Sequence, residues 1–388
     1  MKNVDYMFVY EFPVRADDTM MSDVVCCLRR RGKTVAYIHG FLKRYRPGGL
    51  SLLRVANLFW VYLRLAVLRL TVRPSTLVVR TSPPAVQLWA AILFGSTKTY
   101  MHCWLMDYHP EIEARFLESI NMAGLAKLTR QLDKSLLGRF HSITVLDLAM
   151  KREVVRRIAS ENRVHIYPTW GAARLEESKR DAKIAKKCLT FIYAGNLGYS
   201  HEIKALSKLL SAVQKMKPVI LISLGCSPDG EKRFLSVARS AGVRYIARSR
   251  VAFKDLSVTF KECNADYGVV LLGDKSGGVV SPSKYLGYLE GGIPIVYIGP
   301  EDTNADLCIS YFGAGVALRN AATSAELAEA ASKIMDLGET NDLHNSVVAA
   351  RDHFRRFGGD NFTDHIEKLV ARCKDRETVV ECDKNADK

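Results

Sequence analysis

Short apolar segments alternate with amphipathic helical segments along almost the whole chain, and this alternation limits the possible folds more than any other feature. Strands that alternate with helices form parallel sheets covered on both faces, so we expect an α/β fold. The predicted strands span residues 6–10, 34–39, 76–80, 98–102, 143–146 and 164–167 in the first half, and 189–194, 219–225, 243–246, 267–272 and 295–298 in the second. The predicted helices include 19–31, 50–70, 86–94, 202–216, 233–241, 256–263, 283–290, 325–337 and 343–357.

The length of 388 residues fits two domains better than a single hydrophobic core. A charged segment without a strand pattern interrupts the alternation near the middle of the chain. We therefore predict a first domain, a connection, a second domain, helices that pack back toward the first domain, and a flexible tail, over residues 1–170, 171–187, 188–340, 341–375 and 376–388. Open parallel sheets bind ligands beyond the carboxyl ends of their strands, so a ligand site is expected there in each domain.

The stretch SPSKYLGYLEGGIP, residues 281–294, has the features of a helix start that binds an anion. Pro282 suits the first turn of a helix, and Ser281 is then the candidate N-cap. The free N–H groups of Ser283 and Lys284, together with the Lys284 ammonium, would bind a diphosphate. The alternative is an ordinary capped helix in an α/β domain.

Residues 282–294 are similar to the "PSK…EYLAAGkPV" signature in the C-terminal domain of GT-B glycosyltransferases, specifically the large retaining group numbered family four. Residues 191–198 (FIYAGNLG), 107–111 (DYHPE) and 81–84 (TSPP) resemble three further motifs of that family, and all four follow the family order. The resemblance implies two Rossmann-like domains that face each other across a cleft. It also implies an enzyme that moves a sugar from a nucleotide-diphosphate sugar to an acceptor hydroxyl, with retention, in polysaccharide or glycoconjugate biosynthesis.

The resemblance also implies where the donor binds. Relatives often carry a ribose-binding glutamate where this chain has Gly287, and Glu290 is the candidate substitute. Many relatives hold the phosphates with an Arg and a Lys after the first strand of the second domain, where this chain offers His201 and Lys204. Enzymes of this type stabilise the leaving diphosphate with a helix end and cationic side chains, so neither a metal nor another cofactor is expected. The candidate substrate-binding residues of this domain are Gly195, Asn196, His201, Lys204, Ser281, Ser283, Lys284 and Glu290.

Asp107, His109 and Glu111 cluster after a strand of the first half, and they are the candidate catalytic residues. A carboxylate and an imidazole at such a place can orient or deprotonate an acceptor hydroxyl. The alternative is a helix start, in which the dipole favours Glu111 in the first turn. Glu11 follows the first strand and is a further candidate substrate-binding residue, with an exposed loop acid as the alternative.

The formal net charge of +15 suits a phosphorylated substrate or an anionic membrane surface. Nucleic acid is not expected, because the sequence has no zinc-finger spacing and no RNA-binding aromatic signature. The predicted helix 50–70 joins apolar residues such as Phe59 and Trp60 to several arginines, so it is either a partly buried core helix or a contact with anionic lipid. Nine scattered cysteines without a CxxC pair indicate a reducing compartment. The expected location is cytoplasmic, with peripheral binding at the inner face of the membrane as an extension.

The expected partners are a nucleotide sugar and a carbohydrate or lipid-linked acceptor. Two other functions remain open at this point. One is a different GT-B enzyme, such as a sugar-nucleotide epimerase, which would act on the donor without an acceptor. The other is a binding protein that keeps the fold without catalysis, which the glycine at position 287 motivates.

Overall fold

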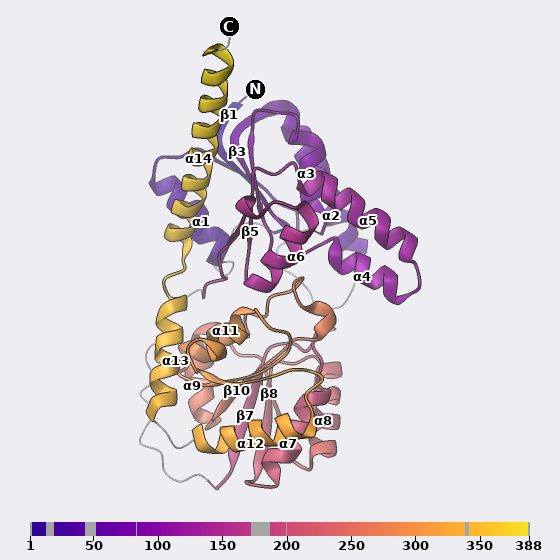
Figure 1. Cartoon of the computed structure of the whole chain (residues 1–388), viewed down its shortest axis with the longest axis vertical. Helices are drawn as coiled ribbons and strands as arrows, with labels where there is room; N and C mark the ends of the chain where they lie inside the picture. Colours follow the sequence, from indigo (N-terminus) through magenta and orange to yellow (C-terminus); the bar gives the residue numbers. More distant parts are fainter. Residues whose placement is uncertain are drawn as a thin grey trace. The chain divides into compact units, whose positions relative to one another are not determined.

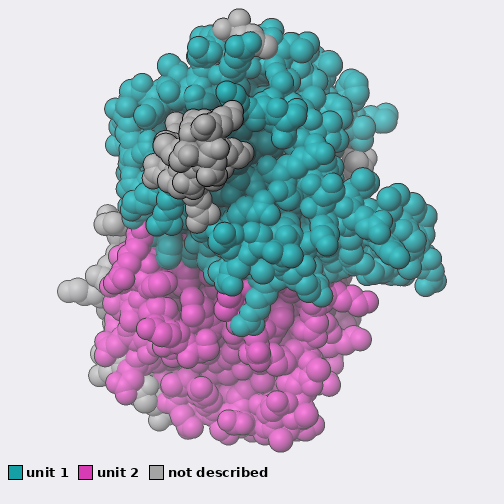
Figure 2. Space-filling model, turned by 45° about the horizontal axis from the view of Figure 1, so that its top comes forward, with its two compact units in different colours: residues 1–146, 150–168, 357–388 teal, residues 147–149, 169–356 magenta. Residues whose placement is uncertain are grey.

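The computed structural model describes residues 2–12, 19–42, 52–82, 84–171, 187–198, 200–337 and 341–386. The chain divides into two compact units, coloured teal and magenta in Figure 2. Unit 1 contains residues 1–146, 150–168 and 357–388, and unit 2 contains residues 147–149 and 169–356. The predicted connection 171–187 lies almost entirely outside the described residues.

Unit 1 is built on a six-stranded parallel sheet with the strand order β2-β1-β3-β4-β5-β6. Its strands are β1 (Lys2–Val9), β2 (Val35–Ile38), β3 (Val72–Arg80), β4 (Tyr100–Trp104), β5 (Ser142–Val145) and β6 (Val164–Ile166). Its helices are α1 (Thr19–Arg30), α2 (Leu52–Thr71), α3 (Val86–Phe94), α4 (Glu111–Ser119), α5 (Ala123–Leu137), α6 (Leu148–Ile158), which begins at the unit boundary, the 3-10 turn η1 (Glu161–Arg163) and α14 (Gly359–Ala386).

Unit 2 is built on a second six-stranded parallel sheet, with the order β12-β11-β10-β7-β8-β9. Its strands are β7 (Leu189–Ala194), β8 (Val219–Leu224), β9 (Arg244–Arg248), β10 (Tyr267–Leu271), β11 (Ile295–Ile298) and β12 (Gly315–Leu318). Its helices are α7 (Lys204–Gln214), α8 (Pro228–Ala241), η2 (Phe253–Asp255), α9 (Leu256–Glu262), η3 (Asp274–Ser276), α10 (Lys284–Glu290), α11 (Asn304–Ser310), α12 (Ser324–Leu337) and α13 (Asn341–Phe354). Helices α7 and α12 lie side by side on one face of the sheet (Figure 1).

Both sheets contain a point at which the strand order reverses. In unit 1 it lies between β1 and β3, and in unit 2 it lies between β7 and β10. Open α/β sheets bind ligands beyond the carboxyl ends of the strands at such a point. A ligand site is therefore expected at the residues that follow β1 and β3 in unit 1, and at those that follow β7 and β10 in unit 2.

The packing of α10 on the sheet of unit 2 depends on a glycine in β10. A side chain at Gly268 would meet the Tyr288 ring at 2.3 Å, so only glycine leaves room for that ring. The Tyr288 hydroxyl donates to the Val269 carbonyl at 3.2 Å and accepts from the Ala194 N–H at 2.8 Å. This buried tyrosine fixes α10 against β7 and β10, and so places Lys284 at the start of α10 beside the end of β7.

The structure adds elements that the sequence pattern did not predict, among them α4, α5, α11 and β12. In α5 a leucine stripe (Leu125, Leu128 and Leu132) is exposed, whereas Ala126 and Leu137 are buried. Apolar residues on two faces obscure the single stripe by which an amphipathic helix is usually predicted. The segments α11 and β12 are only seven and four residues long, which is too short for a clear period.

The C-terminal region differs from the prediction in two respects. Helix α13 belongs to unit 2, whereas α14 returns to unit 1 and packs beside α1 (Figure 1). Residues 376–386, which were predicted as a tail, form the end of α14, which continues to Ala386. The two glutamates, two lysines and one arginine of residues 376–388 are compatible with a helix.

Candidate functional site

The strand-order reversal of unit 2 brings two loops together. Gly195 follows β7, and Gly273 follows β10. The Gly273 N–H donates to the Ser200 carbonyl at 2.7 Å, which ties the loop after β10 to the loop after β7. These loops lie where a nucleotide binds in folds of this type.

Lys284, the first residue of α10, reaches into this region. Its ammonium lies 5.0 Å from the centre of the Tyr193 ring and 3.3 Å from Nε2 of His201. Burial lowers the pKa of Lys284 to about 8, so the ammonium is still charged at neutral pH although it has lost much of its hydration. A desolvated cation of this kind gains more from a bound anion than a hydrated one does.

Gly195 and His201 surround this ammonium. Gly195 has a φ of +106°, a backbone conformation that favours glycine. A side chain there would also meet Cε of Lys284 at 3.2 Å, so the glycine leaves room for the lysine. His201 accepts a hydrogen bond from the Gly198 N–H at its Nδ1, at 3.0 Å. Burial and the positive charges of Lys284 and Arg233 lower the pKa of His201 to about 4, so its ring is neutral at neutral pH.

Arg233 is a cation of this site that the sequence analysis missed. Its guanidinium donates to the carbonyls of Gly198 and His201 at 3.3 and 3.0 Å, and so holds the loop after β7. Helical periodicity could have found it, because Gly230, Phe234 and Val237 of α8 are buried and Arg233 lies at the edge of that face.

The other predicted residues of unit 2 do not all join this cluster. Asn196 accepts from the Ser227 N–H at 3.1 Å through its side chain, which links the β7 loop to the start of α8. Lys204 is exposed at the start of α7, and no interaction between it and Lys284 or His201 occurs in the described part of the chain. The first intrahelical hydrogen bond of α10 ends on Ser283, so Ser283, rather than Ser281, is the N-cap residue and Pro282 precedes the helix.

Glu290 has a structural partner. Arg355, just beyond α13, donates to both carboxylate oxygens of Glu290, at 2.9 and 2.6 Å. This bidentate pair ties the end of α10 to the segment that follows α13, so the carboxylate is already engaged. Its contacts favour a structural role over the ribose contact that we expected.

Gly287, where relatives often carry the ribose-binding acid, is buried in α10. A side chain there would lie 3.4 Å from Leu256 and 3.9 Å from Phe253, which are ordinary contact distances. This face of α10 therefore packs against apolar side chains of η2 and α9 and carries no acid at position 287.

In unit 1 the strand-order reversal lies beside Glu11. The Ser82 hydroxyl, which follows β3, donates to Oε2 of Glu11 at 3.0 Å, and Nε of Arg54 lies 3.5 Å from Oε1. The Glu11 side chain is almost completely buried, so it is not the exposed loop acid of the alternative interpretation. A buried carboxylate at the carboxyl ends of β1 and β3 is suited to accept hydrogen bonds from a hydroxyl-bearing ligand.

Asp107 and His109 follow β4 at the same edge of this sheet. Partial desolvation by the surrounding protein raises the pKa of Asp107, and the charges of His109 and Arg80 oppose this effect, while part of the residue remains accessible to solvent. His109 pairs through Nδ1 with Glu113 at 2.5 Å, and its peptide bond to Pro110 is cis. A reachable carboxylate with a raised pKa beside an oriented imidazole is suited to proton transfer.

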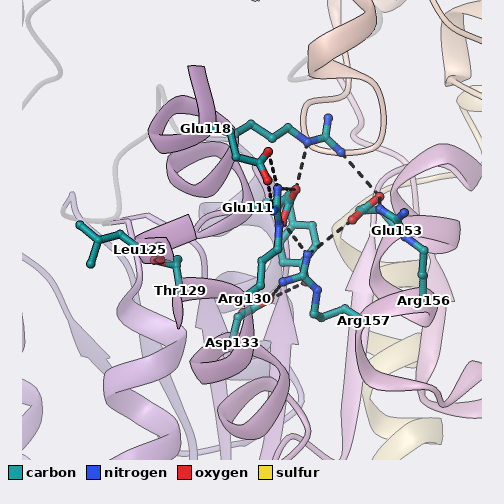
Figure 3. Close-up of polar contacts among 11 residues, drawn as sticks. Glu111, Glu118, Leu125, Thr129, Arg130, Asp133, Glu153, Arg156 and Arg157 are labelled. Atoms are coloured by element: carbon teal, nitrogen blue, oxygen red, sulfur yellow. Dashed lines mark hydrogen bonds and ion pairs between the residues drawn. The ribbon is translucent and has the colours of Figure 1, made fainter. Parts of the chain in front are cut away.

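Glu111 lies at the centre of a buried network of charges (Figure 3). Arg115 donates to Oε1 at 3.1 Å, Arg130 donates to both oxygens at 2.9 Å, and Arg157 donates to Oε2 at 2.5 Å. Burial alone would raise the pKa of Glu111, but these hydrogen bonds outweigh it and hold the pKa at about 2. A carboxylate in this environment does not accept a proton at neutral pH, which favours a structural role for Glu111.

Other carboxylates share the same arginines. Glu153 lies near Arg115, Arg156 and Arg157, and Glu118 pairs with Arg130. Asp133 accepts from the Tyr108 hydroxyl at 2.6 Å. The network joins α4, α5 and α6, and so holds the α4–α5 pair to the rest of unit 1 (Figure 3).

The described residues contain neither a metal site nor a membrane span. No group of three or more His, Cys, Asp or Glu side chains is arranged to hold a metal ion among them. None of the described helices combines the length and the apolar character that a bilayer span requires.

No protein-family model matches the sequence, and no curated protein matches it. Solved structures do match. The lipopolysaccharide outer core galactosyltransferase WaaB, in its apo form, is 14% identical with a TM-score of 0.60, over 95% of this chain and 99% of that chain. A glycosyltransferase from Rickettsia africae is 11% identical with a TM-score of 0.58, over 94% and 98% of the two chains. HepE from Anabaena, in complex with UDP and glucose, is 10% identical with a TM-score of 0.58, over 95% and 100%.

These likenesses extend over nearly the whole of each chain, and they confirm the predicted α/β architecture. The chain has the GT-B glycosyltransferase fold, with two Rossmann-like units.

Proposed function

We propose that this chain, which has the GT-B fold, is a glycosyltransferase that moves a sugar from a nucleotide-diphosphate sugar to an acceptor hydroxyl. The observation that carries the proposal is the desolvated Lys284 ammonium at the strand-order reversal of unit 2, between the loops that follow β7 and β10. In sugar transfer, the bond between the anomeric carbon and the diphosphate breaks and a new bond to the acceptor oxygen forms. The leaving diphosphate then carries the additional negative charge.

Unit 2 is proposed to bind the donor. Lys284 contacts the diphosphate, Gly195 allows its close approach, and Arg233 with His201 fixes the loop that surrounds it. A fixed cation at the position where charge develops stabilises the transition state more than the ground state. This arrangement is proposed to need no metal, since side chains supply the positive charge.

Unit 1 is proposed to bind a carbohydrate or lipid-linked acceptor. Glu11 accepts hydrogen bonds from acceptor hydroxyls, and Asp107 takes the proton of the reacting hydroxyl with His109 beside it. The transfer is proposed to retain the anomeric configuration and to serve polysaccharide or glycoconjugate assembly, which the motif resemblance supports. Seven of the described cysteines have free thiols, which supports a cytoplasmic location: Cys26, Cys27, Cys103, Cys188, Cys226, Cys263 and Cys308.

Nucleoside diphosphates test the donor site directly. A ligand that binds the folded protein raises its apparent stability in proportion to ln(1 + [L]/Kd). We expect UDP, GDP or ADP to raise the melting temperature of the protein in the absence of divalent metal and in the presence of EDTA. If no nucleoside diphosphate shifts the melting temperature and none shows binding by calorimetry, the donor site is not where we place it.

Asp107→Asn is expected to lower kcat by about 100- to 10,000-fold, the usual contribution of a general base. The affinity for nucleoside diphosphates should stay unchanged, because Asp107 belongs to unit 1 and the diphosphate site to unit 2. The fold should also persist, since the hydrogen bond from Thr81 Oγ1 ends on the Asp107 backbone carbonyl. Steady-state kinetics and calorimetry measure the two effects separately. An unchanged kcat would remove Asp107 from the mechanism.

We also propose that the protein binds peripherally to anionic membranes through α2. This helix buries only a narrow stripe, formed by Asn57, Val61 and Leu65. It exposes a broad apolar face, which includes Leu52, Leu53, Val55, Phe59, Trp60, Leu63, Val67 and Leu70. An exposed apolar face on a strongly basic chain suits an anionic lipid surface. Of the basic residues beside this helix, Lys43, Arg44 and Arg46 lie outside the described residues.

Phe59→Ser combined with Trp60→Ser should weaken binding to phosphatidylglycerol vesicles by at least about tenfold, since each buried aromatic side chain contributes about 1.5–3 kcal/mol. Vesicle co-sedimentation measures the effect. Val258→Ser combined with Tyr311→Ser is the matched control, because both side chains are exposed apolar groups of unit 2. Equal loss in both double variants would contradict a specific role for α2.

A further inference from the structure

Unit 1 contains a pocket at the edge of its sheet opposite to Glu11 and Asp107. It lies where β4 and β5 begin, at Tyr100 and Ser142, beside η1 and the middle of α14. Its volume is about 420 Å³, which is within the range of small-molecule sites. Glu11 and Asp107 follow the carboxyl ends of β1 and β4, so the pocket is separate from the proposed acceptor site.

Three arginines line this pocket, and no aspartate or glutamate among the described residues does. Arg163 donates to the Gly138 carbonyl at 2.7 Å and to the Ser160 hydroxyl at 3.0 Å. Arg139 reaches the Ala91 carbonyl at 3.4 Å. Among the described residues, none of Arg139, Arg163 and Arg372 pairs with a carboxylate, unlike the arginines around Glu111. The positive charge of the pocket is therefore not neutralised by the described part of the chain.

The remaining polar groups of the pocket are neutral. Nδ1 of His141 accepts from the Met101 N–H at 3.0 Å, so the neutral ring carries its proton on Nε2 and can donate. Burial and the charges of Arg372 and Lys151 lower the pKa of His165, which keeps this ring neutral at neutral pH. The Tyr100 hydroxyl donates to Ser142 at 2.7 Å. The charge of the pocket is thus supplied by guanidinium groups.

Phe140 and Leu369 add an apolar surface to the same pocket. We propose that the pocket binds a phosphate-bearing ligand, with the phosphate between Arg139, Arg163 and Arg372 and its carbon skeleton against Phe140 and Leu369. Guanidinium groups match the geometry of phosphate oxygens and bind them through paired, charge-assisted hydrogen bonds. The ligand is a phosphate ester, either of a soluble molecule or of a lipid headgroup. The site does not depend on the proposed glycosyltransferase activity.

Binding of inorganic pyrophosphate to Lys284→Ala protein tests the pocket without the proposed donor site. Titration calorimetry should show one site whose affinity falls at least tenfold after Arg139→Gln and Arg372→Gln, and also falls with rising salt. Both side chains are exposed, so the double variant should fold. Arg29→Gln with Lys33→Gln removes the same charge from exposed positions outside the pocket and should leave the affinity unchanged.

Two further ligands identify the source of the phosphate. Glycerol 3-phosphate represents a soluble ester, and vesicles with phosphatidic acid represent a headgroup. A selective loss of either one in the pocket variant supports the proposal and identifies that source. Absence of pyrophosphate binding, or equal binding of all three probes to the pocket variant and the charge-matched control, would overturn it.

Discussion

Lys284→Ala is expected to weaken the binding of nucleoside diphosphates about 10- to 100-fold. A charge-assisted hydrogen bond contributes about 1.5–3 kcal/mol, and each 1.4 kcal/mol changes the dissociation constant about tenfold. The fold should not suffer, because the variant removes a desolvated charge that lies near the neutral His201 and pairs with no carboxylate among the described residues. Titration calorimetry of the variant and the wild type measures the change.

Lys204→Ala is the matched control, because Lys204 is an exposed lysine of the same unit and lies on the neighbouring helix α7. It should leave the affinity within about twofold of the wild-type value, since surface charges contribute little. The pH dependence provides a second check. Lys284 loses its charge as the pH rises through about 8, so wild-type affinity should fall there, and the fall should be absent from Lys284→Ala. Unchanged affinity in Lys284→Ala would contradict the assignment of the diphosphate site.

Glu111→Ala is expected to destabilise unit 1 by about 3–5 kcal/mol, because it leaves Arg115, Arg130 and Arg157 without their shared carboxylate. This corresponds to a decrease of about 6–20 °C in melting temperature for a domain of this size. Urea denaturation with a probe in unit 1 measures the loss. The folded-state pKa of about 2 lies below the ordinary value of 4.5, so the stabilisation is present above pH 4.5 and is lost as the pH falls toward 2. The variant should lack this acid-dependent change.

Glu118→Ala is the control within the same network, because Glu118 pairs with Arg130 but its side chain is much more exposed. It should cause a much smaller change in the midpoint of unfolding. If Glu111→Ala keeps wild-type stability but abolishes transfer, then Glu111 has the catalytic role that its sequence motif suggested. If stability falls and activity falls only in proportion to the fraction of unfolded protein, the structural role of Glu111 is supported.

Much of the fold could be predicted from the sequence, because the central strands are buried on both faces. Residues 189–194, which are apolar except for Thr190, and the apolar residues 295–298 are strands in the structure with these bounds. The N-cap of α10 was predicted at Ser281 but lies at Ser283, because a proline is compatible with the residues before a helix as well as with its first turn. Segments such as α4 and α5 were not predicted, because their exposed apolar residues blur the period.

The candidate site was less predictable, because side-chain partners depend on tertiary contacts. Lys284 and Gly195 were identified by motif, and the structure brings them together. Arg233 was missed because it comes from a helix with no family motif. Glu290 and Glu111 looked like site acids in sequence, but their partners Arg355 and Arg130 lie 65 and 19 residues further along the chain. Spacing in the sequence cannot reveal such pairs.

Sugar transfer itself is the most direct test of the proposed function. The protein is incubated with labelled nucleotide sugars and with carbohydrate and lipid-linked acceptors, and both the released nucleoside diphosphate and the labelled product are measured. We predict that release requires donor and acceptor together, persists in EDTA, and falls strongly in Lys284→Ala and Asp107→Asn. Folded protein that binds a nucleoside diphosphate but transfers no sugar from any donor to any acceptor would contradict the proposal, as would an acceptor-independent change of the donor sugar.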